Sequence, residues 1–217
     1  MKIVSKTLTI IMSMVLVVAM LGTGFVFADT EESEPEQPIN IDEFQIHPYT
    51  SVSTVLVMQP NDNTCGPASA YIALYGCGVA GSISGANVQA KINTLATAMQ
   101  TNSNGTIVNK IANVMNNYLT NKLYTCTLCT GTAIFSDYVY SSLSNGRIPI
   151  LHAKTTSLPY YNGNTIYHYI AVQAYDGPNL TLTLYDCNNN STYYGIHSVP
   201  FLAAYNSVAG RYLINYH

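Results

Sequence analysis

The order of the apolar patterns along the chain constrains the fold more than any other feature of the sequence. In the first two thirds of the chain, apolar residues recur at helical spacing in four segments: 64–76, 87–99, 106–119 and 132–143. In the last third, β-rich runs predict strands at 148–153, 165–175, 180–187 and 211–216. A strand near 122–128 and a short helix near 198–205 depart from this order. Helices that precede strands are typical of α+β domains. We therefore predict an α+β fold with an N-terminal helical part and a C-terminal antiparallel sheet.

Cys65 stands at the start of the first predicted helix, directly after a polar loop, in the sequence QPNDNTCGPAS. A helix N-terminus has unpaired N–H groups and a partial positive charge, which favour the reactive thiolate. Gly66 is expected to leave the space beside the sulfur open to a substrate backbone. Gln59 lies six residues before Cys65. Its side-chain amide and the Cys65 backbone N–H would form a two-donor oxyanion hole. Cys65 is therefore a candidate nucleophile, and the alternative is a buried structural cysteine.

A histidine and an aspartate on two neighbouring strands could complete this site. The runs 165–175 and 180–187 are joined by the turn formers Gly-Pro-Asn, which predicts an antiparallel hairpin. His168 lies on the first strand and is the candidate base for a thiol nucleophile. Asp186 ends the second strand and could orient His168 as the third member of a triad. Asp176, beside the turn, is the alternative acid. Taken alone, His168 would be interpreted as an ordinary strand histidine.

Three segments together resemble a known enzyme family. The segments QPNDNTCGPAS, HYIAVQAYD and LYDC resemble the papain-like cysteine peptidases of the double-glycine, bacteriocin-leader-processing group, and in particular its standalone exported members. The resemblance covers residues 55–216. It implies a papain-like fold, with Cys65 as nucleophile, His168 as general base and acid, Asp186 as orienting residue and Gln59 in the oxyanion hole. It implies no metal and no organic cofactor. The sequence differs from the family pattern at Cys187, where proline is more common, and in the lack of a transporter segment.

The N-terminal residues have the pattern of an export signal followed by a spacer. Residues 1–28 combine a basic start, an apolar run at 10–21 and the small residues of Val-Phe-Ala at 26–28, as in a secretory signal peptide. The alternative is an uncleaved anchor, although a spanning helix needs about 20 apolar residues. Seven of the 11 acidic residues lie before residue 44, so we expect a disordered acidic spacer at 29–47 and a peptidase domain at 48–217. The expected location is extracellular or at the cell surface, with no membrane contact after cleavage.

Charge and cysteine content limit the partners. After residue 43, the chain has four acidic residues, six Lys and Arg residues and no basic cluster. We therefore expect no nucleic acid partner. We expect a monomer that binds a peptide or protein substrate. Five cysteines are an odd number for an exported chain, so Cys65 is the free one if the other four pair. Cys126 and Cys129 form a C-x-x-C half-site that no second pair completes, which argues against zinc. His152 is expected to be a core or cleft-wall residue.

These features predict a secreted cysteine peptidase that hydrolyses peptide or amide bonds. A thiol acyltransferase is a second hypothesis, because the same thioester intermediate serves both reactions. A third is a non-catalytic exported domain of the same fold that binds peptides or glycans, since a fold does not determine a function.

Overall fold

The structure is a computed structural model that describes residues 46–121, 124–208 and 210–216. The predicted signal peptide and residues 29–45 of the predicted spacer lie outside the described residues. Within the described part, each helix is too short or too polar to cross a membrane.

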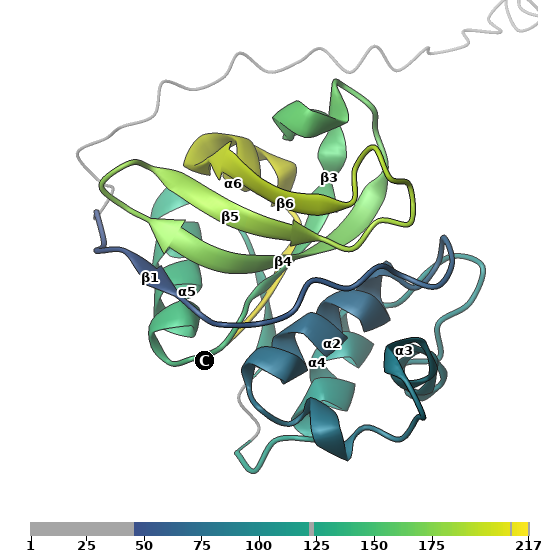
Figure 1. Ribbon diagram of the computed structural model, residues 1–217. Helices are drawn as coiled ribbons and strands as arrows, with labels where there is room; N and C mark the ends of the chain where they lie inside the picture. The colour runs from purple at the N-terminus through teal and green to yellow at the C-terminus, as the bar shows by residue number, and fades with distance from the viewer. Residues whose placement is uncertain (1–45, 122–123, 209, 217) are drawn as a thin grey trace, which may run out of the picture. The chain divides into compact units, whose positions relative to one another are not determined.

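The helices lie in two groups around a sheet (Figure 1). The first group consists of α2 (Cys65–Gly76), α3 (Val88–Ala98) and α4 (Val108–Asn116). The second consists of α5 (Thr132–Ser144) and α6 (Phe201–Val208). Three 3-10 turns, η2 (Ala80–Ser82), η3 (Thr155–Ser157) and η4 (Pro159–Tyr161), complete the helical elements of the described residues. Helix α2 packs along β4, whereas α5 and α6 pack on β3, β4 and β7.

The strands form one antiparallel sheet in the order β2-β7-β3-β4-β5-β6, and the short β1 pairs with β4. They span Thr50–Ser51 (β1), Tyr124–Leu128 (β2), Ile150–Lys154 (β3), Tyr167–Asp176 (β4), Thr181–Asp186 (β5), Gly195–Pro200 (β6) and Tyr212–Tyr216 (β7). Strands β4 and β5 form the predicted hairpin, with a register shift between Val172 and Ala174. The α+β prediction is therefore confirmed, with the helices of the first group before the strands that carry His168 and Asp186.

Strand β6 differs from the sequence prediction. Residues 198–200 were expected to start a helix, but they end this strand, and α6 begins at Phe201. As an edge strand of the sheet, β6 pairs with β5 alone, and most of its residues are exposed or partly exposed. A strand that buries so little apolar surface has weak apolar alternation, which explains why the pattern was missed.

Helix α2 is buried on all sides, with ten consecutive buried residues from Cys65 to Leu74. A helix covered on every side is apolar around its whole circumference. The buried hydroxyl of Ser69 in this helix donates to Tyr169 O at 2.8 Å and so does not remain unpaired. A Cβ on Gly66 would lie 2.9 Å from Ile111 Cδ1 and 3.0 Å from Thr106 Oγ1. Gly66 therefore allows close packing of the chain around α4, and the expectation that it opens space for a substrate is wrong.

Residues 46–59 form an extended segment that runs from α5 along the sheet to α2 (Figure 1). At its start, the His47 ring stacks on Tyr140 with 4.1 Å between ring centroids, and His47 Nε2 lies 2.9 Å from Asp137 Oδ1. Strand β1 follows, and the segment ends where Gln59 N donates to Cys187 O at 2.7 Å. The sheet and α5 thus hold the segment that carries Gln59.

Candidate active site

Cys65 is the first residue of α2, and the loop before it is closed by local hydrogen bonds. Thr64 Oγ1 donates to Asn61 O at 2.9 Å and accepts from Asn61 N at 3.2 Å. Thr64 thus stabilises the turn before the helix and makes no side-chain cap bond to it. The turn directs the chain into α2 at Cys65, whose exposed fraction is 7%.

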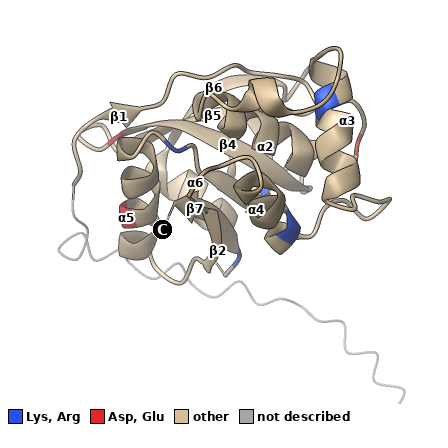
Figure 2. Cartoon of the chain, turned by 90° about the horizontal axis from the view of Figure 1, so that it is seen from below, with Lys and Arg blue, Asp and Glu red and all other residues tan. Residues whose placement is uncertain are grey.

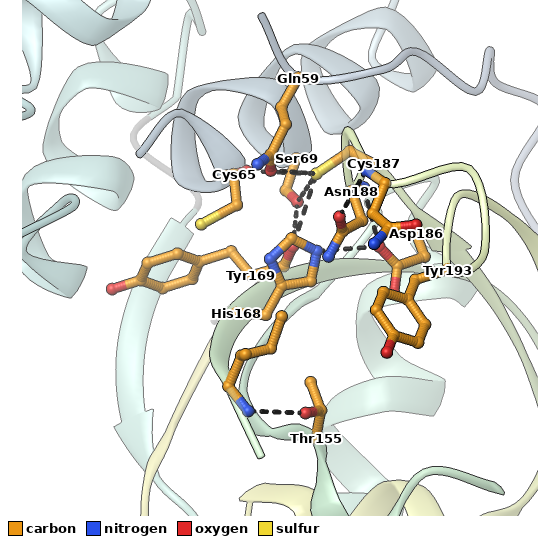
Figure 3. A network of polar contacts seen from close by, with 12 residues as sticks. Gln59, Cys65, Ser69, Thr155, His168, Tyr169, Asp186, Cys187, Asn188 and Tyr193 are labelled. Atoms are coloured by element: carbon orange, nitrogen blue, oxygen red, sulfur yellow. Dashed lines mark hydrogen bonds and ion pairs between the residues drawn. The ribbon is translucent and has the colours of Figure 1, made fainter. Parts of the chain in front are cut away.

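His168 lies between Cys65 and Asp186 (Figure 3). Its Nε2 atom is 2.8 Å from Asp186 Oδ1, and both side chains are buried. Neighbouring strands position the pair, since His168 is near the start of β4 and Asp186 ends β5. Because Nε2 is bound to Asp186, the other ring nitrogen, Nδ1, remains for Cys65. The structure therefore brings together Cys65, His168 and Asp186, as the sequence predicted.

The three groups shift one another's pKa values. Burial would raise the pKa of the Cys65 thiol, but the hydrogen bond and charge of His168 outweigh it and lower this pKa. Burial would lower the pKa of His168, but the Asp186 carboxylate raises it well above its ordinary value. The pKa of Asp186 is lowered, because the His168 charge and several hydrogen bonds outweigh burial. All three shifts favour a thiolate, an imidazolium and a carboxylate in contact.

The alternative acid, Asp176, has another function in the fold. Its Oδ1 accepts from Asn179 N at 3.2 Å and its Oδ2 from Asn179 Nδ2 at 2.7 Å, so it closes the β4–β5 turn. Of the two candidate acids, Asp186 is the one that contacts His168.

Residues 49–213 match the peptidase C39-like family. This chain belongs to that family. Members of the family are cysteine peptidases, which agrees with a cysteine, a histidine and an aspartate at the candidate site.

Two solved structures with a TM-score of 0.50 support the same fold. The peptidase domain of Streptococcus ComA, a bifunctional ABC transporter involved in a quorum-sensing pathway, is 19% identical over 75% of this chain and 98% of that chain, with a TM-score of 0.50. A protein from Bacillus anthracis, described as a C39-like peptidase, is 17% identical over 77% and 97%, also with a TM-score of 0.50. A double-glycine-motif protease from an AMS/PCAT transporter, in complex with the leader peptide, is 12% identical over 77% and 94%, with a TM-score of 0.49. No curated protein sequence matches the chain.

Gln59 of this C39-like peptidase lies beside the start of α2 (Figure 3). Its side chain is 4% exposed. Its Oε1 accepts from Cys187 Sγ at 3.9 Å, and its Nε2 makes a long 3.4 Å contact with Asn189 Oδ1. An Nε2 with one weak partner remains available to an oxyanion, so the predicted role of Gln59 stays a prediction that the geometry allows.

Replacing Gln59 with alanine should lower kcat for peptide cleavage by about 100- to 1000-fold, because one oxyanion donor is lost. KM should change much less, since the donor acts on charge that develops in the transition state. The matched control is Asn189→Ala, which removes the weak partner of Nε2 and should leave kcat within a few-fold of wild type. Equal effects of the two substitutions on kcat would contradict the oxyanion role.

Cys187 was not recognised as part of this site from the sequence. Its thiol is fully buried and lies 3.6 Å from Cys65 O, 3.6 Å from Ser69 Oγ and 3.7 Å from Tyr169 O. Burial raises the pKa of Cys187, in contrast to that of Cys65. Cys187 is therefore a neutral thiol behind the nucleophile that also interacts with His168. Its signal in the sequence was the cysteine in place of the family's proline.

All five cysteines are free, so the possible disulfides among Cys77, Cys126, Cys129 and Cys187 are not formed. Cys126 Sγ donates to Val108 O, at the start of α4, at 3.4 Å, whereas Cys129 is fully buried near Tyr205 of α6. The two thiols of the C-x-x-C segment thus lie near different helices and do not form a disulfide with each other. Among the described residues, no group of three or more His, Cys, Asp or Glu side chains is arranged to hold a metal ion.

Cys65 opens onto a cavity of about 220 Å³ with a wall of mixed polar and apolar surface. The other lining residues are Asp62, Asn63, Ser103, Asn104, Gly105, Thr106, His152, Tyr167 and Tyr169. His152 stacks on Tyr169 and lies 3.0 Å from Arg211 Nη2. Burial and the Arg211 charge lower the pKa of His152 to about 4. His152 is therefore a neutral wall of the cleft, and it does not compete with His168 for a proton near neutral pH.

Lys and Arg residues are spread over several elements of the described domain and do not form one patch (Figure 2). The cleft itself is lined by one carboxylate, Asp62, and by no lysine or arginine. Such a wall gives no array of positive charges for phosphates to bind.

Proposed function

We propose that this C39-like peptidase is a secreted enzyme that hydrolyses peptide bonds with Cys65, His168, Asp186 and Gln59. The observation that supports this proposal most is the buried contact between His168 and Asp186, on the side of the imidazole ring away from Cys65. On the other side of the ring, His168 lowers the pKa of the Cys65 thiol. An ordinary buried thiol would have a raised pKa, as Cys129 has, at about 11. Secretion is supported by the signal-peptide pattern of residues 1–28.

The reaction follows from the charges of the three groups. The Cys65 thiolate attacks the peptide carbonyl carbon, and the oxyanion accepts hydrogen bonds from the Cys65 N–H and Gln59 Nε2. His168, as the imidazolium, donates its Nδ1 proton to the leaving amine when the C–N bond breaks. Neutral His168 then takes a proton from water, and the resulting hydroxide attacks the thioester. The C–S bond breaks, which releases the carboxylic acid and restores the Cys65 thiolate beside the His168 imidazolium. Asp186 holds His168 through Nε2 in both steps and stabilises the imidazolium.

The cleft is suited to a peptide in extended conformation. The wall next to Cys65 includes backbone at Gly105 and side-chain amides at Asn63 and Asn104, which can form hydrogen bonds with the peptide groups of a substrate. The ComA peptidase domain belongs to a transporter in a quorum-sensing pathway, and we propose for this chain an extracellular peptide or protein as substrate.

One mass-spectrometry experiment tests location and chemistry together. The full chain is expressed in a bacterial host, collected outside the cytoplasm and treated with a peptidyl chloromethyl ketone. The expected mass is that of a chain beginning at Asp29 with one label on Cys65. The label should be absent from Cys65→Ala and present in Cys77→Ala, which removes a thiol outside the cleft. The untreated protein should cleave members of a mixed peptide library.

Two outcomes would overturn parts of the proposal. A folded wild-type protein that neither reacts with the ketone nor cleaves any peptide would favour the binding domain. Peptide products that carry an added amine in place of a free carboxylate would show acyl transfer instead of hydrolysis.

A further inference from the structure

Two tyrosine hydroxyls contact the same oxygen of Asp186. Tyr160 and Tyr161, from η4, each donate to Asp186 Oδ2 at 2.9 Å. The other oxygen, Oδ1, contacts His168 Nε2 at 2.8 Å and accepts from Asn188 N at 2.9 Å. Four donors therefore surround one fully buried carboxylate. Neither the predicted triad nor the mechanism above uses the two phenols.

The two phenol rings are held by stacking from a second part of the chain. The Tyr160 ring stacks on His197 of β6, with 3.6 Å between centroids and an interplanar angle of 1°. The Tyr161 ring stacks on Tyr193, in the β5–β6 connection, at 4.3 Å and 17°. Asn188 Nδ2 also donates to the Tyr161 hydroxyl at 3.2 Å. The hydroxyls are thus fixed in direction before any substrate binds.

Both phenols remain protonated donors over the working pH range of a protein. Burial and the Asp186 charge raise the pKa of Tyr160 far above its ordinary value. Burial also raises the pKa of Tyr161, by more than the His168 charge lowers it. A hydrogen bond donated to a carboxylate stabilises its ionised form, and this effect is stronger away from water.

We propose that Tyr160 and Tyr161 are positioning residues that keep Asp186 ionised and reserve its Oδ1 for His168. This inference rests on the proposed function. Because the phenols occupy Oδ2, His168 binds through Nε2 to Oδ1, and Nδ1 is directed to Cys65. Because the phenols stabilise the ionised carboxylate, Asp186 keeps its charge at lower pH. The charged carboxylate in turn stabilises the imidazolium of His168.

The sign of the pH effect follows from the lowered pKa of Asp186. Loss of a phenol hydroxyl raises this pKa, so Asp186 takes up a proton at a higher pH than in the wild type. The acid side of the kcat/KM profile should therefore move to higher pH. In the double variant Tyr160→Phe/Tyr161→Phe, kcat/KM at acidic pH should fall by about 10- to 100-fold, as expected for the loss of hydrogen bonds to a charged group. The fall should be clearly smaller on the alkaline side.

The experiment compares full-length wild type with Tyr160→Phe, Tyr161→Phe and the double variant, each of which keeps the rings. The readouts are kcat/KM on a cleaved peptide and the rate of Cys65 alkylation by iodoacetamide, both from pH 4.5 to 9. The single variants each retain one phenol on Asp186 and should show intermediate profiles. Tyr193→Phe is the matched control, because its hydroxyl accepts from Asn164 Nδ2 and does not contact Asp186; its profile should coincide with wild type.

The result that would overturn the inference is a profile of unchanged shape in the double variant, whether the rate is unchanged or falls equally at every pH. Failure of the proposed function is a different observation, namely a wild-type protein that cleaves no peptide. In that case the alkylation profile of Cys65 still decides the role of the two phenols, since alkylation needs no substrate.

Discussion

Replacing His168 with alanine should abolish nearly all peptide cleavage, with a fall in kcat of about 10⁶-fold, as for the loss of a base that acts as one unit with its nucleophile. Two effects combine in this variant. The leaving amine loses its proton donor, and Cys65 loses the group that lowers its pKa. Burial is then the largest remaining influence on the pKa of Cys65 and favours the neutral thiol, so the reactive thiolate becomes scarce near neutral pH.

The pH dependence of Cys65 alkylation measures this change directly. In the wild type, iodoacetamide should already react quickly with Cys65 in the acidic range, because thiolates paired with imidazolium have pKa values of about 3.5–7.5. In His168→Ala, reaction should become fast above pH 8.5 at the earliest, the ordinary thiol range. His152→Ala is the matched control, since His152 lines the same cleft but is neutral. Fast labelling of His168→Ala at pH 6 would contradict the proposed pair.

Asp186→Asn should lower kcat by up to about 10⁴-fold, the loss known for the same change in a Ser-His-Asp triad. The amide can still accept a hydrogen bond from His168, but it has no charge to raise the pKa of His168. Asp176→Asn is the matched control, because Asp176 closes a turn and does not contact His168. A similar loss of activity in both variants would show that the charge on Asp186 has no special role.

The same substitution should change how stability depends on pH. In the wild type the raised pKa of His168 contributes stability below the unfolded value of about 6.5, and this contribution is lost as the pH rises through the folded value. The lowered pKa of Asp186 contributes above the unfolded value of about 3.9, and this contribution is lost as the pH falls through the folded value. Both contributions to stability are fully present between the two unfolded pKa values, at about pH 3.9 to 6.5. Urea unfolding should therefore show the largest difference between wild type and Asp186→Asn at about pH 5, and a difference that is the same at pH 5 and pH 9 would contradict the coupling.

The sequence was sufficient to predict the parts of the fold and site that depend on local pattern. The helix at Cys65 follows a turn-rich loop, and the hairpin with His168 and Asp186 has apolar strands around three turn formers. These signals lie within a few residues of the groups that they position. The sequence leaves Asp176 and Asp186 as alternative acids, and only the contact between neighbouring strands shows that Asp186 is the one beside His168.

Other features depend on contacts between distant segments and could not be predicted. Tyr160 and Tyr161 lie in a 3-10 turn without periodicity, 25 or more residues before the carboxylate that they bind. Gly66 was interpreted as room for substrate because the sequence does not show that Ile111 occupies the space beside it. The exposed edge strand β6 lacks the apolar alternation by which the other strands were recognised.

The attachment of His47 to α5 has a mechanical consequence. Residues 46–59 connect whatever precedes the domain to Gln59, a member of the proposed oxyanion hole. A pulling force on the N-terminal side reaches the stacked His47 and Tyr140 rings and the contact with Asp137 before it reaches β1 or Gln59. A pulling force applied at residue 46 would therefore load the contacts with α5 before it reaches the geometry at Gln59 and Cys65.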